Sequence, residues 1–479
     1  ECMQPVSSKE ISERLWFDNP WWESGTIDHR FQDLPKRFYF SSFFKHTVDR
    51  SVNRAVISMG PRRVGKTVMV YQAVERLIAR GINPQHIVYA SLETPLYTGL
   101  SLEKVLRLFQ EIHGHQRAEE LFVFFDEIQY LKDWEIHLKS LVDSFPSVKF
   151  IATGSAAAAL RLKSRESGAG RFTDYLLPPL KFAEYLNFIG LEGELFFDFQ
   201  EERSNAPDIA RAYRCTDIEK LNGEFINYLN YGGYPEAVFS RTIQQNSTQF
   251  IKSDIIDKVL LRDLPSLYGI SDIQELNRLF TTLAYNSGNE LTLEELASSS
   301  GVAKNTLKRY LEYLEATFLI KKVNRIDDTA KRFKRAASFK VYLTNPSMRA
   351  ALFGYVVDES EAMGLLTETA IYSQWLHTEA IGNLHYARWK KGEVDFVYLD
   401  PIRQKPSWCV EVKWTDRPAR NNELLRNVVY FARKNDLAKL RVTTKTLTYH
   451  KEIDGIEIEL IPAAEYAYLL GKSTFAGAD

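Results

Sequence analysis

The stretch that decides the fold is GPRRVGKT, which consists of Gly60, Pro61, Arg62, Arg63, Val64, Gly65, Lys66 and Thr67. It has the form GxxxxGK[ST], follows an apolar run that starts at Ala55, and precedes a helical pattern expected from Thr67 to Arg80. In this context the pattern predicts a phosphate-binding loop, because glycines let backbone N–H groups surround phosphate and the helix start adds positive potential. All eight residues are expected to bind ATP, with Lys66 on the β- and γ-phosphates and the Thr67 hydroxyl on Mg²⁺. The alternative is a glycine-rich turn that binds nothing.

A second apolar strand pattern, LFVFF at 121–125, ends in Asp126 and Glu127. Asp126 is expected to contact the Mg²⁺ shell, and Glu127 to polarise the attacking water. A third pattern, VKFIAT at 148–153, ends in Thr153, which we expect to sense the γ-phosphate or orient the water. The alternative for the acidic pair is the start of a solvated loop.

The strand patterns alternate with helical segments, which predicts an α/β domain with a parallel sheet. The expected strands lie at 55–59, 86–92, 121–125 and 148–153. One of them separates the phosphate-loop strand from the acidic strand in the sequence. This order, together with Glu127, resembles the P-loop ATPases that carry an additional strand and a catalytic glutamate.

The composition limits the remaining possibilities. A chain of 479 residues suggests two to four domains, and its formal net charge of −1 excludes a globally basic coat for nucleic acid. Three cysteines, far apart, argue against a disulfide framework. No apolar run has the length of a membrane helix, and the first residues lack the pattern of a signal peptide. We therefore expect a cytoplasmic protein without a membrane partner.

The middle of the chain predicts a winged helix-turn-helix. Thr292 and Glu295 form a capping box, Gly301 turns the chain, and a second helix follows with an apolar face. Four polar side chains near the start of this second helix are expected to meet DNA: Lys304, Asn305, Lys308 and Arg309. A wing strand is expected from Phe318 to Arg325. The alternative is a module that contacts protein.

A basic run after the wing adds to the predicted DNA-binding face. It consists of Lys331, Arg332, Lys334, Arg335 and Lys340. Local positive charge on a nearly neutral protein is the expected footprint of nucleic-acid binding.

The C-terminal part carries Glu368 on a helix, Asp395 on a strand, and Glu411 and Lys413 two positions apart on the next strand. This order resembles the PD-(D/E)XK nuclease fold, including its resolvase-like members. The resemblance implies that the three acids hold Mg²⁺ and that Lys413 stabilises the nucleophile or the transition state. The alternative is a half-exposed strand with an ordinary Glu–Lys pair.

Several motifs together resemble bacterial and archaeal AAA-superfamily ATPases with an uncharacterised C-terminal domain. They are GPRRVGKT, FFDEIQYLKDW, IATGSA, GRFTDYLLPPLKFAEYL, YLNYGGYPEAV and KVYLTNPSMRAAL. The resemblance implies an AAA+-like core and a homo-oligomer. Arg171, which lies just before the paired prolines Pro178 and Pro179, could then enter the site of a neighbouring subunit; the alternative is a surface salt bridge.

These patterns divide the chain into five parts. They are an aromatic N-terminal segment at 1–40, a P-loop ATPase core at 41–180, a helical region at 181–289, a winged helix at 290–338 and a nuclease-like α/β domain at 339–479. The aromatic segment is expected to pack as core, with base stacking as the alternative. The predicted function is an ATP-hydrolysing protein that engages DNA. The alternatives are a nucleotide switch or a scaffold acting on a partner, with an inert nuclease-like fold.

Overall fold

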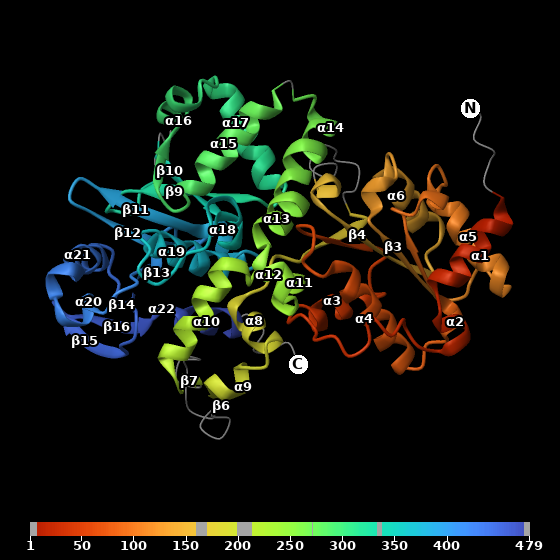
Figure 1. The fold of residues 1–479 in the computed structure, drawn as a ribbon, viewed down its shortest axis with the longest axis horizontal. Coiled ribbons are helices and arrows are strands. Elements are labelled where there is room, and N and C mark those ends of the chain that lie inside the picture. The colour runs from red at the N-terminus through yellow and green to blue at the C-terminus, as the bar shows by residue number, and fades with distance from the viewer. Residues whose placement is uncertain (1–6, 160–169, 199–212, 271, 333–337, 474–479) are drawn as a thin grey trace. The chain divides into compact units, whose positions relative to one another are not determined.

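The computed structural model describes residues 7–159, 170–198, 213–270, 272–332 and 338–473. The chain divides into two units (Figure 1). Unit 1 is chiefly Glu1–Leu177, and unit 2 comprises Pro178–Pro265 and Gly269–Ala476. No helix among the described residues combines the length and the apolar character needed to cross a membrane.

Unit 1 is built on a five-stranded sheet in the order β2-β3-β4-β1-β5. All four strand pairs are parallel. The strands are β1 (Ala55–Met59), β2 (Ile87–Ser91), β3 (Leu121–Asp126), β4 (Val148–Gly154) and β5 (Phe172–Leu176). β4 lies between β1 and β3, so the phosphate-loop strand and the acidic strand are separated by one strand. The strand expected at 86–92, which separates the two in the sequence, is instead β2 at one side of the sheet, so the inserted strand is β4.

Helices connect the strands of unit 1, as expected for parallel pairing. The chief helices are α1 (Ser8–Asp18), α2 (Trp21–Ser24), α3 (Phe40–Val48), α4 (Lys66–Ala79), α5 (Leu102–His113) and α6 (Trp134–Ser144). Short 3-10 turns lie at Pro84–His86, Pro95–Tyr97 and Ile128–Tyr130.

The aromatic N-terminal segment covers the edge of this sheet. The indole N–H groups of Trp21 and Trp22 both donate to the carbonyl oxygen of Ile87, at 3.0 and 2.8 Å. The Asn19 amide bonds to both the N–H and the carbonyl of Tyr89. Because β2 is an edge strand, these side chains satisfy backbone groups that no further strand pairs with. α1 packs against β2 and also against α5, which lies beside it in Figure 1. The expectation of core packing is confirmed for buried residues such as Trp21 and Trp22, whereas Phe17 is exposed.

Unit 2 begins with helices. They are α8 (Phe182–Phe188), α9 (Glu192–Leu195), α10 (Ile218–Tyr231), α11 (Pro235–Phe239), α12 (Arg241–Gln245), α13 (Ser247–Ile251), the first two residues of α14 (Leu264–Tyr268) and α15 (Ile273–Tyr285). Two π-helical stretches, Lys252–Asp257 and Val259–Asp263, join α13 to α14. A small pair of strands, β6 (Phe196–Asp198) and β7 (Tyr213–Cys215), flanks residues 199–212, which lie outside the described residues.

The rest of unit 2 surrounds one mixed sheet of nine strands in the order β15-β16-β14-β13-β12-β11-β9-β10-β8. The strands are β8 (Glu290–Thr292), β9 (Ile320–Ile326), β10 (Ser338–Leu343), β11 (Leu384–Trp389), β12 (Gly392–Leu399), β13 (Pro406–Glu411), β14 (Lys439–Thr444), β15 (Tyr449–Ile453) and β16 (Ile456–Pro462). The helices are α16 (Leu293–Ser300), α17 (Lys304–Ala316), α18 (Ser347–Phe353), α19 (Met363–Ser373), α20 (Arg417–Arg420), α21 (Arg426–Lys434) and α22 (Ala463–Ser473).

The predicted helix-turn-helix elements are present as α16 and α17. Thr292 and Glu295 form the expected capping box, and Gly301 ends α16 in the left-handed conformation. The strands next to these helices, β8, β9 and β10, belong to the nine-stranded sheet, because β9 pairs in parallel with β11. One sheet therefore contains strands from both sides of residue 338, where the sequence analysis divided the chain.

Candidate nucleotide site and carboxylate–lysine centre

The phosphate loop connects β1 to α4, and its backbone requires glycine at two positions. A Cβ added at Gly60 would lie 2.1 Å from the carbonyl oxygen of Leu177, so no side chain fits there. Gly65 has a φ of 96° and begins α4 in the left-handed region, which glycine adopts without strain. The buried Lys66 ammonium donates to the carbonyl oxygens of Gly60 at 3.1 Å and Pro61 at 2.6 Å. The loop thus places a cation at a helix N-terminus, where anions bind favourably.

Asp126 is buried at the carboxyl end of β3 and accepts three side-chain hydrogen bonds. Its Oδ2 accepts from the Thr67 hydroxyl at 2.8 Å and from the Tyr89 hydroxyl at 2.7 Å. Its Oδ1 accepts from the Thr153 hydroxyl. Burial raises the pKa of Asp126, and the neighbouring charge of Glu127 raises it further. Strands β2, β3 and β4 and helix α4 therefore bring their polar side chains to one carboxylate.

Glu127 follows Asp126 and leaves the strand. Its φ of 54° lies in the left-handed region, which is strained for a residue with a side chain. The Glu127 N–H donates to the Thr153 hydroxyl at 3.0 Å, and the Gln129 amide donates to the Glu127 carboxylate. The Gln129 side-chain oxygen Oε1 accepts from the Ser155 N–H at 3.2 Å. Glu127 is thus fixed through both its backbone and its side chain.

The residues around Asp126 fit a magnesium ion. Mg²⁺ prefers oxygen ligands, and the Thr67 hydroxyl and an Asp126 oxygen lie 2.8 Å apart at the start of α4. A divalent cation beside Asp126 would lower its pKa, since it favours the charged carboxylate. It would thus act against burial and the Glu127 charge, which raise this pKa.

Three residues at this site carry roles that the sequence analysis missed. Tyr89 from β2 and Gln129 from the turn after β3 contact the two acids directly. The buried Arg37 guanidinium donates to the carbonyl oxygen of Val64 in the phosphate loop at 2.6 Å. Gln129 lies only two positions after Glu127, so the sequence could have indicated its proximity to the acidic pair. Arg37 is far from the phosphate loop in the sequence, and nothing in the sequence indicates their contact.

Arg171 lies at the amino ends of the strands, whereas its own phosphate loop lies at their carboxyl ends. Its carbonyl oxygen accepts from the Ala55 N–H at 2.9 Å, and Ala55 pairs with Phe172 at the amino ends of β1 and β5. The loop follows the carboxyl end of β1. The Arg171 guanidinium pairs with the carboxylate of Asp143. A contribution to catalysis therefore requires a neighbouring subunit, and this role stays a prediction.

Unit 2 gathers the predicted nuclease-like residues into one cluster, which we call the carboxylate–lysine centre; its members are buried except for Lys413, which is half-buried. It consists of Glu368 on α19, Asp395 on β12, Glu411 at the end of β13, Lys413 just beyond it, and Lys340 on β10.

Close contacts link three members of the centre. The Lys413 ammonium lies 2.6 Å from Glu411 Oε1. The Asp395 N–H donates to Glu411 Oε2 at 3.3 Å, and Asp395 Oδ2 accepts from the Val412 N–H at 2.8 Å. The order helix, strand, strand that the sequence predicted is therefore matched by proximity in space.

A β-bulge aims Asp395 into the centre. In the pairing of β11 with β12, His385 lies opposite Val397 and Ala387 lies opposite Val394. Asp395 and the residue after it therefore share one partner position, Tyr386. Bulges of this kind redirect side chains at the cost of one ladder position.

Lys340 distinguishes the centre from the one that the sequence predicted. Its ammonium lies 2.9 Å from Glu368 Oε1 and 3.6 Å from Asp395 Oδ1, and its side chain is 3% exposed. Burial lowers the pKa of Lys340, but the charges of Glu368 and Asp395 outweigh burial and leave this pKa raised. The prediction that Lys340 belongs to an exposed basic run is wrong. The neighbouring Lys334 and Arg335 lie outside the described residues.

The centre does not fit a divalent ion shared by Glu368 and Asp395, because the Lys340 ammonium takes the position between them. Burial first, and the charge of Asp395 second, raise the pKa of Glu368 to about 7 and that of Glu411 to about 8. The charge of Asp395 therefore raises the pKa of both glutamates although Lys340 and Lys413 lie beside the carboxylates.

The four polar residues predicted to meet DNA lie on the exposed side of α17. Lys304, Asn305, Lys308 and Arg309 are exposed, while the apolar face of the helix is buried. Lys304 pairs with Glu294 at 2.6 Å, and both side chains are largely exposed. Exposed pairs of this kind contribute little and exchange readily for phosphate.

Two family models match the chain. Residues 52–186 match a model described as an AAA domain, and residues 222–359 match one described as a domain of unknown function, DUF8612. The first match spans all five strands of unit 1, so the resemblance to AAA-superfamily P-loop ATPases is confirmed for this part. Both matches end before Glu368, the first acidic residue of the carboxylate–lysine centre.

The curated relatives are uncharacterised proteins. One from Methanocaldococcus jannaschii is 25% identical over 388 residues, which cover 78% of this chain and 80% of the relative. One from Haemophilus influenzae is 25% identical over 411 residues, which cover 83% of this chain and 91% of the relative. Matches of this extent include parts of both units. Among solved structures, the Aeropyrum pernix ORC2 protein is 14% identical with a TM-score of 0.40, covering 72% of this chain and 98% of that one.

Proposed function

We propose that unit 1 binds ATP with Mg²⁺ and hydrolyses it. The observation that carries this proposal is the network in which the Thr67 and Thr153 hydroxyls bond to the Asp126 carboxylate while Thr153 also holds the Glu127 backbone. This network brings the start of α4, Asp126 and Glu127 together beyond the carboxyl ends of the strands, which supports the proposal. Ligand sites in parallel α/β sheets form at this edge, beyond the carboxyl ends of the strands.

Each residue has a distinct role in the proposed reaction. The Lys66 ammonium exchanges its carbonyl partners for β- and γ-phosphate oxygens. Thr67 and Asp126 hold Mg²⁺, which supplies neutralisation of phosphate charge when bound. Glu127 accepts a proton from the attacking water, and the Gln129 amide orients its carboxylate. Phosphate release from ATP, compared in the wild type and in Lys66→Ala, tests the proposal.

We further propose that α17 contacts DNA phosphates. The supporting observation is that all four polar residues near its start are exposed on a helix whose apolar face is buried. A helix N-terminus with cations is a favourable place for phosphate, since the helix dipole adds to the side-chain charge.

Replacing Lys304, Lys308 and Arg309 together with alanine is expected to weaken DNA binding. Each lost phosphate contact reduces counterion release, so the slope of log Kobs against log salt should become shallower by about 2 to 3. Fluorescence anisotropy with a labelled duplex at several salt concentrations measures both quantities.

The matched control removes three exposed cations elsewhere in unit 2, namely Arg403, Lys405 and Lys439. This control has the same change of charge and should bind with nearly the wild-type slope. An unchanged affinity and slope in the folded α17 variant would favour a contact with protein instead.

The carboxylate–lysine centre supports a second candidate function. In this alternative, unit 2 is a nuclease-like fold that cleaves nothing, and the chain is a nucleotide-dependent switch that acts on a partner. Lys340 favours this alternative, because it supplies inside the fold the positive charge that a metal would otherwise bring.

A further inference from the structure

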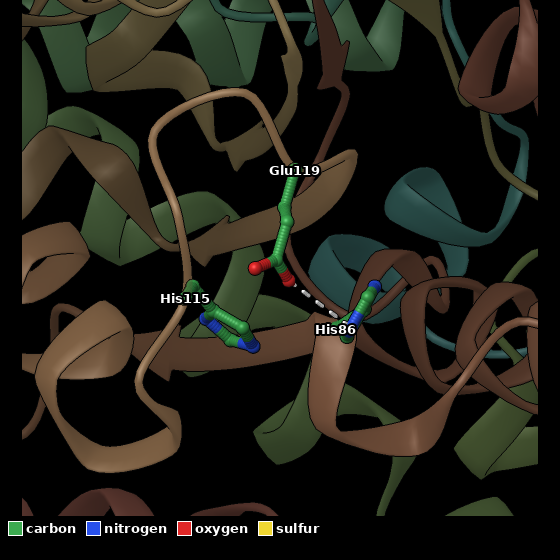
Figure 2. A group of neighbouring side chains, drawn as sticks. All are labelled: His86, His115 and Glu119. Carbon is green, nitrogen blue, oxygen red and sulfur yellow. Dashed lines mark ion pairs between the residues drawn. The ribbon is translucent and has the colours of Figure 1, made fainter.

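Three potential metal ligands lie in unit 1 outside the nucleotide site. His86, His115 and Glu119 each place one ligand atom within 4.8 Å of the other two. His86 Nε2 lies 3.5 Å from Glu119 Oε2, and the two imidazole rings have centroids 5.2 Å apart. Figure 2 shows the carboxylate and the two rings converging from separate segments of the chain. We call these residues the histidine–carboxylate cluster.

The fold brings the histidine–carboxylate cluster together at the amino edge of the sheet. His86 directly precedes β2, and Glu119 lies two residues before β3, which pairs with β2 in parallel. His115 lies in the connection from α5 to β3. The nucleotide site lies at the opposite, carboxyl edge. The cluster therefore belongs to a different place from the proposed ATP hydrolysis.

The ring nitrogens of His115 are available as metal ligands. Both ring nitrogens are buried and make no hydrogen bond of ordinary geometry, and only a weaker hydrogen-bond contact with the Gln85 backbone is present. A neutral imidazole nitrogen offers a lone pair to a metal. A buried nitrogen without a partner otherwise costs free energy.

The chemistry of the cluster selects the kind of ion. Two imidazoles and one carboxylate are ligands that Zn²⁺ accepts, whereas Mg²⁺ and Ca²⁺ prefer all-oxygen sets. Zinc bonds of about 2.0–2.1 Å require ligand atoms roughly 3.4 Å apart in tetrahedral geometry. His86 and Glu119 already lie at 3.5 Å, and His115 must approach by at most about 1.4 Å. The side chains of His86 and Glu119 are 31% and 33% exposed, so an ion in solution can reach them.

We propose that the histidine–carboxylate cluster binds one Zn²⁺ ion through His86, His115 and Glu119. The ion joins the start of the edge strand β2 to the connection between α5 and β3. Three protein ligands leave one position for water. Because the cluster lies away from the phosphate loop, the ion acts on the stability of unit 1.

The test uses the full chain without an affinity tag, freed of metal by a chelator. Zn²⁺ content after dialysis and the visible absorbance of added Co²⁺ are measured in excess Mg²⁺, which excludes weak oxygen sites. The variants are His86→Ala and the nearly isosteric Glu119→Gln. The control is His29→Ala, which removes a histidine of unit 1 whose side chain is 89% exposed.

The wild type and His29→Ala should each bind one Zn²⁺ per chain, show tetrahedral Co²⁺ bands, and melt at a higher temperature with Zn²⁺. His86→Ala and Glu119→Gln should bind at least about 10-fold more weakly and lose the shift in melting temperature. ATP binding should persist in all four proteins and shows that they are folded. The absence of binding in the wild type, or stoichiometric binding that survives both substitutions, would overturn the proposal.

Discussion

Replacing Glu127 with glutamine should lower the turnover of ATP by roughly 100- to 10,000-fold while leaving ATP affinity close to that of the wild type. The amide keeps the size of the side chain and still meets Gln129, but it cannot accept a proton from water. Binding depends on the phosphate loop, which the substitution does not touch. Steady-state phosphate release and equilibrium titration with a fluorescent ATP analogue measure the two effects separately.

The matched control for this substitution is Glu93→Gln. Glu93 is an exposed carboxylate just beyond the carboxyl end of β2, where it accepts from the Tyr130 hydroxyl at 3.2 Å. The same chemical change at this position should leave turnover nearly unchanged. Wild-type turnover in Glu127→Gln, or an equal loss in both variants, would remove Glu127 from its role as base.

Replacing Lys340 with methionine should destabilise unit 2 by about 3–5 kcal/mol, because it leaves buried carboxylates without their cation. Adding Glu368→Gln should recover part of this loss, since a neutral amide can remain buried if it is hydrogen-bonded. Thermal unfolding and hydrogen exchange of peptides from β10, α19 and β12 measure the effect where it arises.

The control for Lys340 is Lys304→Met, which breaks an ion pair of similar length, 2.6 Å, on an exposed helix. Exposed pairs contribute at most about 1 kcal/mol, so this variant should stay near the wild type. Mn²⁺ should stabilise Lys340→Met more than the wild type, because removing the ammonium opens the position between Glu368 and Asp395. Equal stability of the two methionine variants would show that Lys340 is not the counter-ion of the centre.

The sequence predicted the nucleotide-binding half of the fold well for a physical reason. The strands β1 to β4 are buried and apolar, so each stands out as a continuous hydrophobic run. β5 (Phe172–Leu176) was missed, because only one of its neighbours is a strand and its residues are partly exposed. An edge strand of mixed polarity has no pattern that distinguishes it from a loop.

The candidate sites were predicted less completely, because several of the residues that the sequence analysis missed or misplaced come from segments distant in the sequence. The spacing of Glu411 and Lys413 is visible in the sequence, whereas the approach of Lys340 depends on the pairing of β10 within a nine-stranded sheet. The bulge at Asp395 likewise follows from register, which alternation alone does not reveal. Lys340 was taken for a surface cation because its neighbours in the sequence are basic.

Phosphate release from ATP by the wild type and by Lys66→Ala, with Mg²⁺ and with a chelator, tests the central claim most directly. The loss of charged hydrogen bonds should weaken ATP binding by roughly 10- to 100-fold in Lys66→Ala. The account predicts release by the wild type that requires Mg²⁺ and falls to background in Lys66→Ala. Equal release by the two folded proteins, or no release by a wild type that binds ATP with Mg²⁺, would contradict it.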